Sequence, residues 1–201
     1  MFTRRSFICG GLAVLGRAQK SLVEDADFSQ WQSVGAGLWA AEGGEIVGRF
    51  DKNRPGPGYL FTREVFTDFR LAMLFRISNG GRSAIYVREP RRKWSFEGDD
   101  RPGFGPDCGY EVLVNYQDRD NPTGTINNVQ KSKKSVGAEE KWNEMEIVCR
   151  GTEIRVSVAG QLVNRFNQLR VQPGVIGFAV PGVGPQDFSV RFRDIQITSV
   201  T

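Results

Sequence analysis

Two charged residues, Glu111 and Arg88, lie inside otherwise apolar segments of the chain. Burying a charge in a sheet strand costs free energy, so a charged residue at such a position is usually paired or has a function. If the two strands are neighbours, Glu111 could act as a general base or a metal ligand, and Arg88 could hold a substrate. The alternative is a structural ion pair between the two residues that braces the sheet.

Further polar and aromatic residues lie between and after these two positions. The carboxylates of this region are Glu97, Asp99, Asp100, Asp107, Asp118 and Asp120. Clustered oxygen ligands suit Ca²⁺, Mg²⁺ or Mn²⁺, but the spacing matches no cation-binding loop, and solvated loops are the simpler interpretation. Aromatic residues near this loop could stack on a sugar ring or anchor the loop to the protein. The candidate substrate-binding residues are Tyr86, Trp94, Tyr110 and Asp118.

The chain contains no histidine. Serine–histidine and cysteine–histidine nucleophile pairs and the HExxH zinc site are therefore excluded within this chain. Proton transfer must use carboxylates, lysine, tyrosine, cysteine or water. The letters of a dinucleotide fingerprint at 35–40 lack a strand–helix context, so no organic cofactor is expected.

The length of 201 residues fits one domain and leaves room for a sizeable core without disulfides. The net charge is +4, and three of the positive residues, Arg4, Arg5 and Arg17, lie in the first 18 residues, which contain no acid. Without that segment, 24 basic residues face 23 acidic ones, a net charge of +1. Nucleic-acid binding through bulk charge is therefore not expected.

Residues 1–18 have the features of a twin-arginine signal peptide. Arg4 and Arg5 precede a short apolar run over 7–15, and the segment ends in Gly16-Arg17-Ala18. We expect removal of this segment, a periplasmic or secreted protein, and no membrane span afterwards. The alternative is a short amphipathic start of a cytoplasmic protein.

Two cysteines, Cys108 and Cys149, would remain after removal of the signal peptide. In an oxidising compartment they could form one disulfide. Cys149 alternates with Met145 and Ile147 on one face of a predicted strand, which favours a buried, unpaired thiol.

The rest of the chain has the period-two alternation of β-strands. Predicted strands cover 68–77, 83–88, 110–116, 144–149, 154–158, 161–166, 175–180 and 188–197. In the second of these, Ala84, Tyr86 and Arg88 share a face, and in the last a bulge near Arg193 or Asp194 explains a change of register. Frequent turns between short strands predict a single all-β domain over 25–201, an antiparallel sandwich of two sheets.

Several short motifs follow one another in an order that carries more information than any one of them. They are GYLF (58–61), FTDFRL (66–71), SAIYVR (83–88), GYEV (109–112), PTG (122–124), WNE (142–144), GVIGF (174–178) and FRDI (192–195). This series resembles the 3-keto-disaccharide hydrolase domain family over nearly the whole chain after the signal segment. The resemblance implies a concanavalin A-like, laminin G-like jelly roll.

The resemblance also implies a carbohydrate substrate whose carbon 3 a partner oxidoreductase has oxidised to a ketone. A base can remove the acidified hydrogen on carbon 2, the group on carbon 1 leaves, and water adds back. This route needs a base, a group or divalent ion that stabilises the enolate, and a proton donor. The residues matching the family pattern that could act at the centre are Glu111 and Arg88.

Some positions depart from the family pattern. The usual Asn-Ser-Gly reads Arg82-Ser83-Ala84, two usual glutamines read Leu113 and Ala179, and a usual aspartate reads Tyr116, for which Asp118 could substitute. Two hypotheses remain: an exported hydrolase or lyase of 3-keto-glycosides, and a non-catalytic carbohydrate-binding jelly roll. A pocket that combines Glu111, Arg88 and Asp118 favours the first, and an open aromatic platform favours the second.

Overall fold

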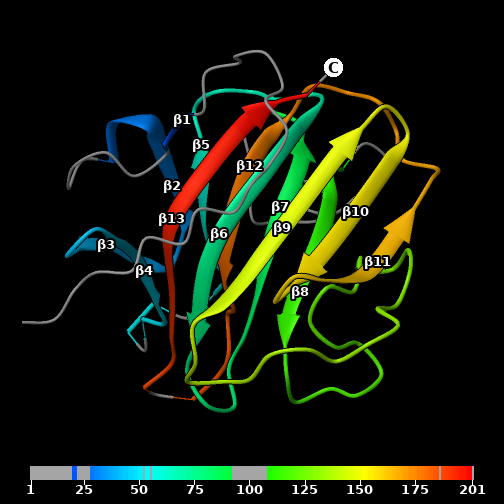
Figure 1. Cartoon of the computed structure of the whole chain (residues 1–201). Coiled ribbons are helices and arrows are strands. Elements are labelled where there is room, and N and C mark those ends of the chain that lie inside the picture. The colour runs from blue at the N-terminus through cyan, green and yellow to red at the C-terminus, as the bar shows by residue number, and fades with distance from the viewer. Residues whose placement is uncertain are drawn as a thin grey trace, which may run out of the picture.

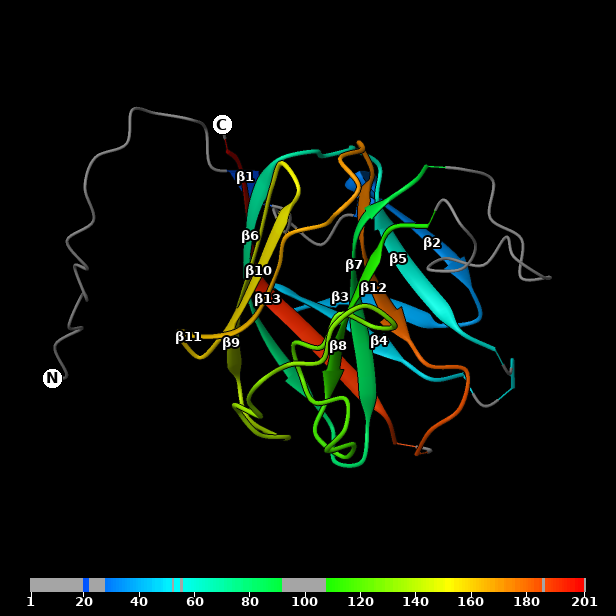
Figure 2. The same ribbon diagram turned by 90° about the vertical axis from the view of Figure 1, so that its right-hand side faces the viewer.

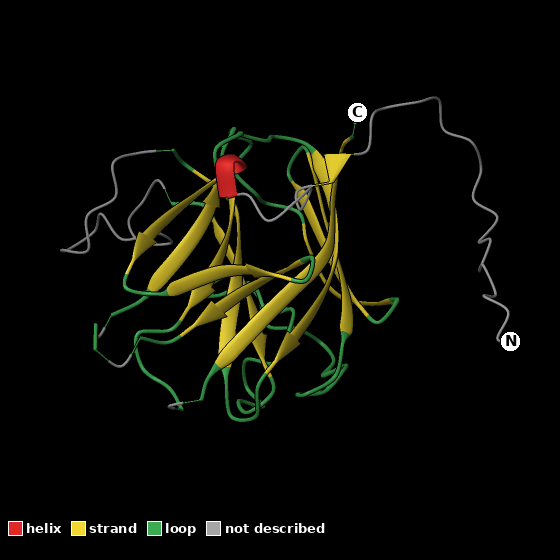
Figure 3. Ribbon diagram, turned by 90° about the vertical axis from the view of Figure 1, so that its left-hand side faces the viewer, coloured by secondary structure: helices red, strands yellow, loops and turns green. Residues whose placement is uncertain are grey.

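The computed structural model describes residues 20–21, 28–51, 53–54, 56–91, 108–185 and 187–200, and its regular structure is almost entirely β-strand (Figures 1 and 3). One 3-10 turn, η1 (Phe28–Gln30), is the helical element of this part of the chain. The strands are β1 (Lys20–Ser21), β2 (Trp31–Gly35), β3 (Leu38–Glu42), β4 (Glu45–Arg49), β5 (Gly58–Thr62), β6 (Phe69–Ile77), β7 (Arg82–Glu89), β8 (Tyr110–Asn115), β9 (Asn143–Arg150), β10 (Glu153–Val158), β11 (Gln161–Phe166), β12 (Val175–Val180) and β13 (Ser189–Ser199). No helix within the described ranges is long and apolar enough to cross a membrane.

The strands form two antiparallel sheets that lie face to face (Figure 2). The larger sheet has the order β11-β10-β9-β6-β13-β4-β3, with β1 added beside β13, and the smaller has the order β2-β5-β12-β7-β8. Alternate residues of β6 are fully buried, and Phe178 of β12 stacks on Phe192 of β13 with ring centroids 4.0 Å apart. Apolar burial between the sheets therefore confirms the predicted antiparallel two-sheet sandwich.

The predicted strands agree with the structure to within two residues at each end. The bulge is also confirmed, because the pairing of β13 with β6 shifts between Arg193 and Gln196 and Asp194 has a φ of 51°. Strands β2 to β5 were not predicted. All five residues of β5 are buried, so this strand shows no alternation of apolar and polar residues. Cys149 is a free thiol that is fully buried in the core, so its predicted buried, unpaired state is confirmed.

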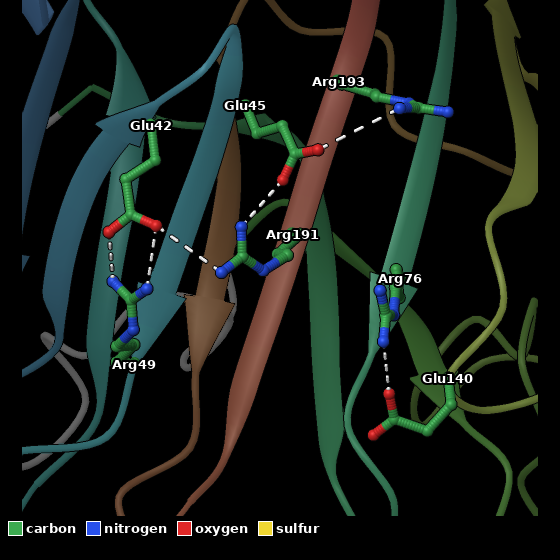
Figure 4. Close-up of polar contacts among 7 residues, drawn as sticks. All are labelled: Glu42, Glu45, Arg49, Arg76, Glu140, Arg191 and Arg193. Atoms are coloured by element: carbon green, nitrogen blue, oxygen red, sulfur yellow. Dashed lines mark hydrogen bonds and ion pairs between the residues drawn. The ribbon is translucent and has the colours of Figure 1, made fainter.

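The outer face of the larger sheet is lined with ion pairs (Figure 4). Guanidinium and carboxylate groups lie 2.8 Å apart in the pairs Arg49–Glu42, Arg191–Glu45 and Arg76–Glu140. These side chains are partly exposed to solvent, so each pair contributes little to stability. This face is a solvated, charge-paired surface.

The side chain of Arg88 lies in the interior and joins the two sheets. Its Nε donates to the Thr67 carbonyl at 2.7 Å, and one Nη donates to the carbonyls of Gly151 and Arg170 at 2.9 and 3.0 Å. The other Nη donates to Asp68 Oδ1 at 2.8 Å, and the Arg88 side chain is 0% exposed. Arg88 therefore connects β7 to the chain just before β6 and to the turn after β9.

The predicted face of Arg88 was wrong. Simple alternation puts Arg88 beside Tyr86, but Arg88 has a left-handed φ of 52°, and the pairing of β12 with β7 shifts between Val175 and Gly177. This bulge turns the guanidinium inward, where it pairs with Asp68 and not with Glu111. The catalytic role expected for Arg88 does not fit this position, because the guanidinium is buried and bound to protein oxygens.

We predict that Arg88→Ala lowers the free energy of unfolding by about 3–5 kcal/mol, because it leaves buried carbonyls and a carboxylate without their donor. The matched control is Arg70→Ala, which breaks the partly exposed pair with Glu146 on the outer face and should cost at most about 1 kcal/mol. Urea unfolding measures both values. Equal, small losses would contradict the account of Arg88 as a connection between the sheets.

Candidate functional site

A cavity of about 340 Å³ lies on the outer face of the smaller sheet. This volume falls within the usual range of small-molecule sites. Its floor includes Tyr59, Ala84, Tyr86, Leu113 and Ala179, from four neighbouring strands. These residues form an apolar cluster separate from the core between the sheets, so the cavity has a floor that is mostly apolar.

The register of β7 against β8 brings two of the predicted site residues together. Tyr86 lies directly opposite Glu111, and both line the cavity. The next residue along each strand, Val87 and Val112, points into the core instead. Antiparallel partners on one face have close Cβ atoms, so the strand pairing itself places the Tyr86 phenol near the Glu111 carboxylate.

The loop residue Asn127 fixes the position of Glu111 through two hydrogen bonds. Asn127 Nδ2 donates to Glu111 Oε2 at 2.6 Å, and the Asn127 backbone N–H donates to the Glu111 carbonyl at 2.8 Å. Glu111 is partly exposed, so its carboxylate can be reached from the cavity. A fixed, accessible carboxylate is suited to take a proton from a bound molecule.

Burial raises the pKa of Tyr86 well above its ordinary value, and the negative charge of Glu111 raises it further. The phenol is therefore neutral at physiological pH. In this state Tyr86 can donate a hydrogen bond to a bound oxygen but cannot act as a base. The pair thus consists of a carboxylate and a neutral hydrogen-bond donor.

Asp118 lines the other end of the cavity, after β8. Its Oδ1 accepts hydrogen bonds from the backbone N–H groups of Asp120 and Asn121 at 2.8 and 3.2 Å, and its Oδ2 accepts one from Asn121 Nδ2 at 2.9 Å. The bond from the Asn121 side chain, followed by those from the backbone, lowers the pKa of Asp118. Asp118 is therefore an anion whose orientation is fixed by its own turn.

The structure places Arg88 and Tyr110, the other described residues of the predicted set, away from this cavity. Tyr110 faces the core side of β8, and its hydroxyl accepts a hydrogen bond from the Arg170 backbone N–H at 2.7 Å. Trp94 lies outside the described residues, together with Phe96, Glu97, Asp99, Asp100 and Asp107. Of the predicted set, Glu111, Tyr86 and Asp118 therefore share one site.

The departures from the expected family pattern fall mostly on the cavity. Arg82, Ala84, Leu113 and Ala179 line it, whereas Tyr116 packs against the core between the sheets. Asn127 was missed by sequence reasoning because it reaches Glu111 from a loop, and no periodicity marks such a residue. In the part of the chain that the structure describes, no three cysteine or carboxylate side chains are grouped to hold a metal ion.

Comparison with known proteins matches residues 18–198 to the family model of the 3-keto-alpha-glucoside-1,2-lyase-like domain. The chain belongs to this family. The match covers most of the chain and includes both sheets and the cavity. No curated protein sequence matches the chain at a significant level.

Solved structures of the same fold are distant in sequence from this lyase-like domain. A candidate glycosyl hydrolase from Parabacteroides distasonis has a TM-score of 0.70 at 17% identity, over 92% of this chain and 100% of that one. A Bacillus subtilis protein of unknown function with a galectin-like fold has a TM-score of 0.68 at 12% identity, over 90% and 94%. The carbohydrate-binding module CBM66 from Bacillus subtilis has a TM-score of 0.60 at 18% identity, over 85% and 96%. These neighbours establish the jelly-roll fold, and the family match establishes a carbohydrate-related, hydrolase-like domain.

The raised pKa of Tyr86 predicts how stability depends on pH. The native state keeps the Tyr86 proton above pH 10, where an unfolded tyrosine loses it, so the free energy of unfolding falls as the pH rises above 10. Tyr86→Phe removes this titration and should give a shallower fall. Denaturant unfolding at a series of alkaline pH values measures both slopes.

Glu111→Gln is the control for the cause of the shift. It removes the charge but leaves burial, the larger cause, in place, so the slope should stay closer to that of the native protein than to that of Tyr86→Phe. Identical slopes for the native protein and Tyr86→Phe would contradict a buried, neutral Tyr86.

Proposed function

We propose that the cavity cleaves glycosides whose sugar carries a ketone on carbon 3, with Glu111 as the base. The observation that carries this proposal is the accessible Glu111 carboxylate, held by Asn127 and facing Tyr86 inside the one cavity that both line. Membership of the lyase-like family supports the reaction class. The proposal also assumes a partner oxidoreductase that makes the ketone.

The reaction balances in two steps. Glu111 takes the proton from carbon 2, the electron pair forms a double bond between carbons 1 and 2, and the bond from carbon 1 to the leaving oxygen breaks. The leaving oxygen takes the proton from Glu111 and departs as an alcohol, which regenerates the Glu111 carboxylate. Water then adds across the double bond, with its hydroxyl on carbon 1 and its hydrogen on carbon 2, to give the free 3-keto sugar.

The neighbours of Glu111 have supporting roles in this proposal. The neutral phenol of Tyr86 donates a hydrogen bond to the oxygen on which negative charge develops, which lowers the barrier to proton removal. Asn127 orients the carboxylate. The described part of the cavity offers Glu111 and Asp118 as carboxylates, at different ends, which does not make a site for Ca²⁺, Mg²⁺ or Mn²⁺, and no step is assigned to a cation.

The alternative function is binding of carbohydrate without cleavage. The apolar side chains Leu113 and Ala179, which stand on the cavity floor in place of the polar residues of the family pattern, favour this alternative. They leave Glu111 with fewer polar neighbours for a sugar. A protein of this kind would bind the intact glycoside in the same cavity.

Export is part of the proposal and rests on residues 1–18, which lie outside the described residues. The twin arginines Arg4 and Arg5 and the apolar run support it, and the family match begins at residue 18, at the end of this segment. We expect the exported protein to begin at Gln19. N-terminal sequencing tests this, and an intact N-terminus on protein recovered from the cytoplasm would contradict it.

We predict that Glu111→Gln lowers kcat/KM for a 3-keto-glucoside with a chromogenic leaving group by about 100- to 10,000-fold, the usual value of a positioned base. The native protein should release the chromophore, and the assay is repeated with Mn²⁺ or Ca²⁺ and with a chelator. The amide keeps the shape of the side chain and its contact with Asn127.

The matched control is Glu153→Gln, which removes one carboxylate from the outer face of the larger sheet and should leave kcat/KM unchanged. Saturable binding of the intact glycoside without release by the native protein would refute cleavage and support the binding alternative.

A further inference from the structure

We propose that the cavity selects glycosides whose leaving group carries an anionic group, such as a carboxylate, and that Arg82 binds this group. The inference deepens the proposed function and rests on it. It begins from the cation at the end of the cavity opposite Glu111, which the reaction itself does not use.

Arg82 lines the cavity, and its side chain is exposed. It has no side-chain hydrogen bond or ion pair with any other described residue. The arginines on the outer face of the larger sheet are different, since Arg49, Arg76 and Arg191 all have carboxylate partners (Figure 4). The guanidinium of Arg82 therefore keeps its donors free for a ligand, in the planar arrangement that suits a carboxylate.

The polar groups around Arg82 are already occupied. Asp118 lines the same cavity but lies in no ion pair with Arg82, and its oxygens accept three hydrogen bonds from its own turn. Asn115, which faces Arg82 in the strand pairing, donates to the Asn121 carbonyl at 3.3 Å. Among the described residues, the guanidinium is therefore a cation at this end that no carboxylate pairs with, which favours an anionic acceptor as its ligand.

Strand geometry places Arg82 beyond the reach of a sugar ring that is bound at Glu111. Arg82 and Tyr86 are both in β7, and their partners in β8 are Asn115 and Glu111. Four residues of strand span about 13 Å, which is longer than one sugar ring. A ring bound with its carbon 2 at Glu111 therefore ends before Arg82, and in this proposal it lies with its carbon 1 side toward the guanidinium, so that the leaving group reaches Arg82.

The test compares two aryl 3-keto-glucosides, one with a 4-carboxyphenyl and one with a 4-carboxamidophenyl leaving group. We expect Arg82→Gln to lower kcat/KM for the carboxylate by about 10- to 100-fold, the usual effect of one hydrogen bond to a charged group, and to change the amide less than about twofold. Differences in leaving-group reactivity cancel, because both proteins receive the same two substrates. Arg82→Lys should retain part of the preference.

Arg150→Gln is the matched control, because it removes one exposed positive charge at the end of β9, away from the cavity. It should leave the ratio of the two substrates unchanged. An equal effect of Arg82→Gln on both substrates would overturn the inference, and so would an equal effect of the two variants.

Calorimetric binding of the corresponding unoxidised glucosides separates this inference from the proposed function, since these compounds lack the ketone and cannot react. If neither keto-glucoside is cleaved but the carboxylate glucoside binds the native protein more tightly than Arg82→Gln, the cleavage proposal fails and the charge recognition stands. If both proteins bind the carboxylate and amide glucosides equally, charge recognition fails.

Discussion

The buried guanidinium of Arg88 is the interaction on which the positions in the site depend. A charge that is 0% exposed is tolerated only when its donors are satisfied, and Thr67, Asp68, Gly151 and Arg170 supply the acceptors. These partners lie outside the smaller sheet, so the four hydrogen bonds fix the end of β7 in space. The strand fixed in this way also carries the cavity residues Tyr86 and Arg82.

The two outer faces of the sandwich have different roles. In both sheets the residues that face the core are apolar, but the outward-facing residues that alternate with them differ between the sheets. Outward positions of the larger sheet include several arginines and glutamates that neutralise one another. Outward positions of the smaller sheet are apolar or aromatic, with Glu111 among them and Arg82 at one end. An apolar floor with the carboxylates of Glu111 and Asp118 and the unpaired guanidinium of Arg82 around it is suited to bind a polyhydroxylated molecule.

Strand alternation predicted the fold and half of the site. Period two places Tyr86 and Glu111 on one face of their strands, and the structure has them opposite each other. The same rule failed at Arg88, because the left-handed backbone there is selected by acceptors far away in the sequence. The rule also failed to identify β5, because this strand is buried on both faces. It could not identify Asn127, because this residue lies in a loop and contacts Glu111 from there. Local sequence contains no information on such long-range contacts.

Removal of the carbon 2 proton by Glu111 would exchange that proton with solvent, and this exchange can be measured. A 3-keto-glucoside is incubated with the protein in heavy water, and the hydrogen on carbon 2 is followed by proton NMR. We predict deuterium on carbon 2 of the released sugar, and no protein-catalysed exchange with Glu111→Gln. Release of a sugar that keeps its original hydrogen on carbon 2 would show direct hydrolysis and contradict the account.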